Sequence, residues 1–122
     1  MGPGFRVTPL LRDTWNPSFY YLGLRGISVA GKVVPIPKGT FEILPNGTGG
    51  LVIDSGTPIT ELEDPGYMPF LDAVRSAIPT QPVNASAVTY LDLCYNAIPA
   101  LRFPIITFHF AGGANYVLPH EN

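Results

Sequence analysis

Cysteine is nearly absent from this sequence. Cys94 is the only one among 122 residues, so a disulfide within the chain is excluded. Two interpretations of Cys94 are open: a buried thiol that packs as a small hydrophobic side chain, or half of a disulfide whose partner lies outside this chain. Composition by itself favours the buried thiol.

Charged residues are also scarce. They make up 13% of the chain, against 46% hydrophobic residues, and the formal net charge is -2. This balance excludes a disordered charged tail, and without a run of Lys and Arg it predicts no nucleic-acid partner. No apolar stretch reaches the roughly 18 residues that a membrane span needs. Residues 1–6 lack the apolar centre of a signal peptide, so we expect none in this chain.

Proline and glycine, in contrast, are abundant. The 14 prolines and 13 glycines separate short apolar segments, a pattern typical of a mainly β domain with many turns. We expect strands over 19–29, over 33–36 after a turn at 30–32, at 51–53, from 59–60 onward, at 90–95, at 104–110 and at 115–118. The continuously apolar run 51–53 predicts a strand buried on both faces.

One helix is expected, over 65–77. Its apolar residues recur at helical spacing, which predicts one face packed on the core. Asp64 is expected as the N-cap, with Pro65 in the first helical position. Pro69 does not suit a helix interior, because proline removes a hydrogen bond and crowds the preceding turn.

The strand at 51–53 ends in Asp54-Ser55-Gly56-Thr57. A carboxylate at the end of an apolar strand needs hydrogen-bond partners or a function. Gly56 can bring its backbone N–H close, while Ser55 and Thr57 add hydroxyl groups that can donate. Local chemistry agrees equally well with two roles for Asp54. It is either a catalytic carboxylate or a side chain that only caps its own turn.

Other polar motifs are weaker. His109 and His120 are not spaced with acidic residues or Cys94 like a zinc site, so we expect no metal and no cofactor. A triad of Ser55, His109 and an aspartate lacks a nucleophile elbow, and both histidines are expected to be solvated. Two glycosylation sequons are present, Asn46-Gly47-Thr48 and Asn84-Ala85-Ser86, whereas proline excludes Asn16-Pro17-Ser18.

Longer segments of the sequence favour a catalytic role for Asp54. Residues 52–57 resemble the second catalytic motif of pepsin-like aspartic proteases. Residues 19–32, 41–50, 93–95 and 108–114 resemble, in order, the landmarks of the plant, nepenthesin-like members of that family. The chain is therefore identified as a partial C-terminal lobe, residues 1–122, of the bilobal acid protease fold, mainly β with one short helix after the catalytic turn.

The resemblance implies an aspartic endopeptidase acting on polypeptides. Each lobe of that family supplies one aspartate, here Asp54. Gly56 and Thr57 are expected to orient its carboxylate, and Ser55 to contact the loop of the other lobe. One carboxyl is protonated and the other ionised, since close like charges cannot both ionise easily. The resemblance also implies a secretory location, extracellular or vacuolar.

The sequence also lacks several motifs of the family. The Asp-Thr-Gly-Ser motif of the N-terminal lobe is absent, so the isolated chain is expected to be inactive without that lobe. A late apolar-apolar-Gly segment and the cysteine that pairs with Cys94 in the family are absent too. The resemblance thus moves Cys94 towards the half-disulfide interpretation. The alternatives are an inactive binding protein like the plant xylanase inhibitors and, less well matched, a retroviral-type protease made from two identical chains.

Overall fold

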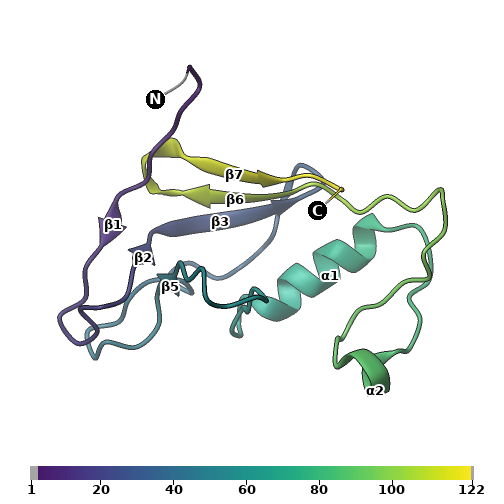
Figure 1. Cartoon of the computed structure of the whole chain (residues 1–122), viewed down its shortest axis with the longest axis horizontal. Helices are drawn as coiled ribbons and strands as arrows, with labels where there is room; N and C mark the ends of the chain where they lie inside the picture. The colour runs from purple at the N-terminus through teal and green to yellow at the C-terminus, as the bar shows by residue number, and fades with distance from the viewer. Residues whose placement is uncertain (1–2, 122) are drawn as a thin grey trace.

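A computed structural model of the chain describes residues 3–121 and confirms a mainly β fold. Figure 1 shows a long helix below the larger of two sheets, with the smaller sheet at one end of the molecule. The strands are β1 (Leu10–Leu11), β2 (Tyr21–Leu22), β3 (Leu24–Val29), β4 (Lys32–Val33), β5 (Leu51–Val52), β6 (Ile106–Phe110) and β7 (Asn115–Leu118). The helices are α1 (Tyr67–Ala77), α2 (Ser86–Thr89) and the 3-10 turn η1 (Ala111–Gly113).

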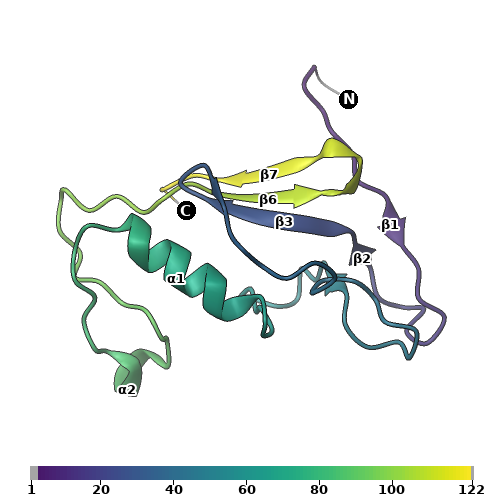
Figure 2. The same ribbon diagram turned by 180° about the vertical axis from the view of Figure 1, so that it is seen from behind.

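Both sheets are antiparallel. The larger has the order β4-β3-β6-β7, and the smaller has the order β1-β2-β5. Seen from behind, the segment between α1 and β6 extends away from the sheet and carries α2 (Figure 2). Among residues 3–121, no helix is long and apolar enough to cross a membrane.

The core lies between the larger sheet and α1. Ile27 is fully buried on β3 and pairs with Phe108 on β6. Apolar residues of β6 alternate with polar ones, so one face of this strand packs on the core, as its pattern predicts. The helix contributes Phe70 and Val74 to the same core, which confirms the expected packing of its apolar stripe. Fully burying a side chain of this kind, as at Ile27, stabilises the fold by about 1.5–3 kcal/mol, and the partly buried Phe70 and Val74 contribute less.

The strand expected over 19–29 divides at Gly23, so this prediction is correct only in part. Residues before Gly23 form β2 of the small sheet, and residues after it form β3 of the large sheet. A Cβ at Gly23 would lie 3.2 Å from the Cβ of Ala111, whose backbone N–H donates to the Gly23 carbonyl. This close approach requires a small residue where the chain passes from one sheet to the other.

The hairpin after β3 follows the expected turn. Ala30 and Gly31 both have positive φ, 50° and 77°, which is the backbone of a two-residue type I′ loop. The return strand is shorter than expected and ends at Val33, although Val34 N still donates to Ile27 O at 2.9 Å. Pro35 has no N–H with which to continue the pairing.

The expected start of the helix is wrong by two residues. The N-cap is Gly66, which has no side chain to cap the helix, although Asp64 Oδ1 accepts a hydrogen bond from Met68 N in the first turn at 3.4 Å. Residues before it form a turn in which Gly66 N and Tyr67 N both donate to Glu63 O, so Asp64 lies too early to serve as the N-cap. Pro69 is the third helical residue. Because the first four N–H groups of a helix have no partner within it, proline costs no hydrogen bond there.

Two strand predictions are wrong, and a third, the strand at 51–53, is present as β5 but wrong in its burial. Residues 59–60 and 90–95 form no strand, and the latter segment has only an isolated bridge between Val83 and Cys94. The strand at 51–53 is not buried on both faces, since 40% of Val52 and 55% of Ile53 are exposed. Their apolar side chains instead border an open groove.

Candidate catalytic site

Strand β5 positions Asp54. Val52 pairs with Tyr21 on β2, and Ile53 N donates to Tyr20 O at 2.9 Å, which is the last such bond before the chain leaves the sheet. Asp54 therefore follows directly from a backbone that β2 holds in place. Strand β5 is the outer strand of the small sheet, so its other edge has no strand partner among the described residues.

The loop that follows holds both oxygens of the carboxylate. Gly56 N donates to Asp54 Oδ1 at 2.8 Å, and Thr57 Oγ1 donates to Asp54 Oδ2 at 2.7 Å. A Cβ at Gly56 would lie only 3.2 Å from Oδ1, so a larger residue would crowd the carboxylate. These are the two hydrogen bonds that the sequence predicts. Ser55 is exposed, and its expected contact with another lobe stays a prediction.

These donors act on the charge of Asp54. The Thr57 hydroxyl, and secondarily the Gly56 amide, lower the pKa of the Asp54 carboxyl below its usual value, while slight desolvation opposes them. Hydrogen bonds to the ionised form favour that form. In this chain the Asp54 carboxyl consequently favours its ionised form, and both of its oxygens accept hydrogen bonds.

Asp54 and Thr57 lie on the wall of an open groove of about 780 Å³. Much of this wall is apolar and exposed, including Phe19, Tyr20 and Ile59. The remaining wall comes from Ser18, Thr40, Phe41, Gly49 to Ile53, and Thr60 to Glu63. A carboxylate at the edge of an apolar groove suits a ligand with apolar groups and a polar centre.

The groove wall was not predicted from the sequence. Phe41 precedes Asp54 in the chain and Leu62 follows it, and both line the groove because the fold brings their loops together. Leu62 lies in no sequence motif, and Phe41 begins the segment 41–50 that resembles a family landmark, but that resemblance did not mark it as part of a groove. The wall also carries two further acidic residues, Glu61 and Glu63.

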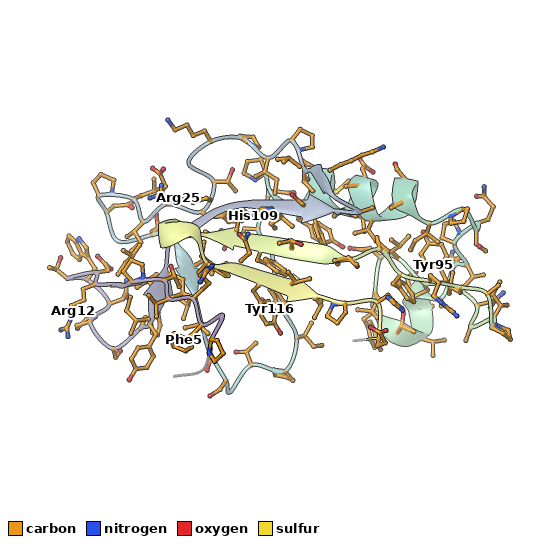
Figure 3. The ribbon with its side chains drawn as sticks, turned by 90° about the horizontal axis from the view of Figure 1, so that it is seen from above. Phe5, Arg12, Arg25, Tyr95, His109 and Tyr116 are labelled. Atoms are coloured by element: carbon orange, nitrogen blue, oxygen red, sulfur yellow. The ribbon has the colours of Figure 1, made fainter. Side chains whose placement is uncertain are left out.

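The expectation that His109 is simply solvated is wrong. Its Nε2 lies 2.7 Å from Ser28 Oγ, and its Nδ1 lies 2.9 Å from Asn115 Oδ1. Figure 3 shows His109 on the central strands of the larger sheet. Only 6% of Ser28 is exposed, so this serine cannot reach a substrate, and His109 forms a structural cross-strand network rather than a triad with Ser55.

The other residues considered for chemistry lie apart from the groove. His120 forms an ion pair with Glu121 at 3.0 Å when protonated. Cys94 is a half-buried free thiol, and its sulfur lies 3.4 Å from Thr89 Oγ1. Among the described residues, no three His, Cys, Asp or Glu side chains gather where they could hold a metal ion.

Comparison with known proteins gives consistent matches over the whole chain. The family described as xylanase inhibitor C-terminal matches residues 19–122. The protein named ASPARTIC PROTEASE IN GUARD CELL 2 of Arabidopsis thaliana is 39% identical over 121 residues, which cover 98% of this chain and 26% of that protein. Aspartic proteinases nepenthesin-1 and nepenthesin-2 of Nepenthes gracilis are 37% and 35% identical, over 94% and 90% of this chain. The chain spans about a quarter of the length of these relatives.

Proposed function

Because this chain belongs to the plant branch of the pepsin-like aspartic proteases, we propose that it is part of the C-terminal lobe of an aspartic endopeptidase. In this proposal Asp54 is one of two catalytic aspartates. The observation that carries it is the Asp54 carboxylate, held by Gly56 and Thr57 on the wall of an apolar groove. Polypeptides are the proposed substrates.

The proposed mechanism needs a second carboxyl group, from an N-terminal lobe. With two carboxyls side by side, one is ionised and the other protonated, and the pair titrates as a unit. The ionised member takes a proton from a water molecule that attacks the scissile carbonyl carbon. The protonated member donates to the carbonyl oxygen, and a proton then passes to the leaving amine. Gly56 and Thr57 hold the Asp54 oxygens in a fixed orientation for this exchange.

The test is cleavage of a peptide at acidic pH by the complete protein that contains this chain. Asp54→Asn should abolish cleavage, because an amide cannot serve as the base. Asp72→Asn is the matched control, since Asp72 is an exposed helix residue outside the groove. Full activity of the Asp54→Asn variant would reject the assignment of this site.

A second candidate is a protein that binds a partner without cleaving it. It is favoured by the match to the family described as xylanase inhibitor C-terminal. The intact Asp54 loop favours the enzyme over the inhibitor. A complete coding sequence with an altered upstream aspartate, together with tight binding of a protein that stays uncleaved, would select this second function.

The proposed location is the secretory route, ending outside the cell or in the vacuole. The support is the family itself, whose acid chemistry suits such compartments. A fluorescent fusion of the complete protein should enter the secretory pathway, and a purely cytosolic signal would contradict this location.

A further inference from the structure

The turn at residues 44–48 carries the sequon Asn46-Gly47-Thr48. Asn46 and Thr48 are both exposed. Two backbone bonds close the turn: Leu44 N donates to Thr48 O at 2.8 Å, and Gly47 N donates to Leu44 O at 2.9 Å. Gly47 has a φ of 79° and packs so close to Trp15 that a Cβ there would lie 2.5 Å from that side chain. The sequon therefore occupies a fixed turn at the surface.

The Asn46 amide is oriented within this turn. Its Oδ1 accepts from Thr48 N at 3.1 Å and from Thr48 Oγ1 at 2.7 Å. Because a backbone N–H can only donate, the amide atom that it contacts must be the oxygen. The oxygen of Asn46 is thus engaged by the residue that defines the sequon. No hydrogen bond among the described residues holds Nδ2, the atom to which an N-linked sugar attaches.

The other two candidate asparagines differ from Asn46. Asn16 precedes a proline, and its Nδ2 donates to Asp13 Oδ2 at 2.9 Å and to Gly47 O at 3.0 Å. Asn84 is exposed, but its amide has a single contact, with Ser86 Oγ at 3.0 Å. Since a hydroxyl can donate or accept, that contact does not fix which end of the amide is free. The geometry therefore singles out Asn46.

We propose that Asn46 is an N-glycosylation site when the chain enters the secretory pathway. Asn46 Nδ2 forms a bond to the anomeric carbon of an oligosaccharide and loses one proton. The bond from that carbon to the diphosphate oxygen of a lipid-linked donor breaks, and the lipid diphosphate leaves. Asn46 is outside the groove wall, although Gly49 and Gly50 in the same hairpin line it. The proposed glycan is accordingly attached beside the groove and not to a residue of its wall.

The experiment places this chain behind a cleavable signal peptide and expresses it in cultured plant cells. All variants carry Asn84→Gln, so that Asn46 is the only remaining sequon. The readouts are gel mobility before and after peptide:N-glycosidase A, and mass spectrometry of the Asn46 peptide after deglycosylation in oxygen-18 water. A parallel incubation in oxygen-18 water without the glycosidase separates enzymatic release of a glycan from spontaneous deamidation at Asn46-Gly47, which also takes up oxygen from water. Cleavage of the signal peptide reports entry into the secretory pathway.

The expected result is a single shift in gel mobility on treatment with the glycosidase, together with an oxygen-18 label at Asn46. Both should disappear in Asn46→Gln and Thr48→Ala and persist in Thr48→Ser, which keeps the hydroxyl. Asn16 should carry no label in any variant. A chain with its signal peptide removed but Asn46 unmodified overturns the proposal. A shift in gel mobility that persists in Asn46→Gln overturns it as well. Neither outcome depends on Asp54, so the proposed protease function is judged separately.

Discussion

At the scale of single residues, the proposed chemistry depends on Asp54 and Thr57. A hydroxyl and a backbone amide each hold one oxygen of the carboxylate, and these bonds stabilise its ionised form. The same bonds close an Asx-type turn, which is the structural role that the sequence also allowed. The position of Asp54 on the wall of the groove supports the catalytic role that we propose.

Removing the Thr57 hydroxyl should raise the pKa of the Asp54 carboxyl. In Thr57→Val the larger of the two stabilising hydrogen bonds is lost, while the side chain keeps its shape. The measurement is a pH titration of the Asp54 carboxyl carbon by NMR. Thr57→Ser retains a hydroxyl and should retain the low pKa. An unchanged pKa in Thr57→Val would show that this bond does not form in solution.

The same substitution should change how stability depends on pH. The folded chain holds the pKa of Asp54 below its ordinary value. The resulting stabilisation is complete above the ordinary pKa of an aspartate, and it is lost as the pH falls through the lower folded value. The difference in unfolding free energy between the wild type and Thr57→Val should therefore shrink on acidification. A difference that grows at low pH would contradict this sign.

At the scale of strands, His109 joins three elements of the larger sheet. It contacts Ser28 on β3 and Asn115 at the start of β7. Since Ser28 is buried, its hydroxyl depends on this partner. The network therefore contributes to the register of β3, β6 and β7, of which β3 and β6 lie far apart in the sequence.

Removing His109 should destabilise the chain more than its hydrogen bonds alone would suggest. His109→Ala leaves a buried hydroxyl without a partner, at a cost of about 1–3 kcal/mol. The double variant Ser28→Ala with His109→Ala removes both groups, and we expect it to be no less stable than His109→Ala. Urea unfolding of the two variants gives this comparison. A double variant that is less stable by the full sum of the single effects would exclude a direct coupling.

At the scale of the whole molecule, much apolar surface is uncovered. The groove wall exposes aromatic and aliphatic side chains, and β7 is an outer strand of the larger sheet. On β7, 58% of Tyr116 and 52% of Val117 are exposed, and Figure 3 shows Tyr116 on this strand. An exposed apolar edge strand favours pairing with another chain.

The isolated chain should consequently self-associate. We expect sedimentation to show species larger than a monomer as the concentration rises. Val117→Lys puts a charge on the edge strand and should reduce this association, whereas Ser76→Lys adds the same charge on exposed helix surface and should reduce it less. A concentration-independent monomer that unfolds cooperatively would contradict the expectation.

Sequence patterns predicted the structural features that depend on residues adjacent in the chain. The hairpin at Ala30 and Gly31, the pairing of β6 with β7 and the bonds around Asp54 all follow from a few adjacent residues. Features that depend on distant contacts were missed. The division at Gly23 reflects a close approach of η1, and the groove gathers loops that are remote in sequence. The partners of His109 lie on other strands, so its own strand gives no sign of them.

The most direct test of Asp54 as a catalytic aspartate is kcat/KM for acid cleavage of a peptide by the complete protein, with and without Asp54→Asn. The predicted result is a fall of at least about 10²- to 10⁴-fold, the usual contribution of a positioned acid or base. The Asp72→Asn control should stay at the wild-type value. Equal kcat/KM values for the wild type and Asp54→Asn would contradict a catalytic role for Asp54.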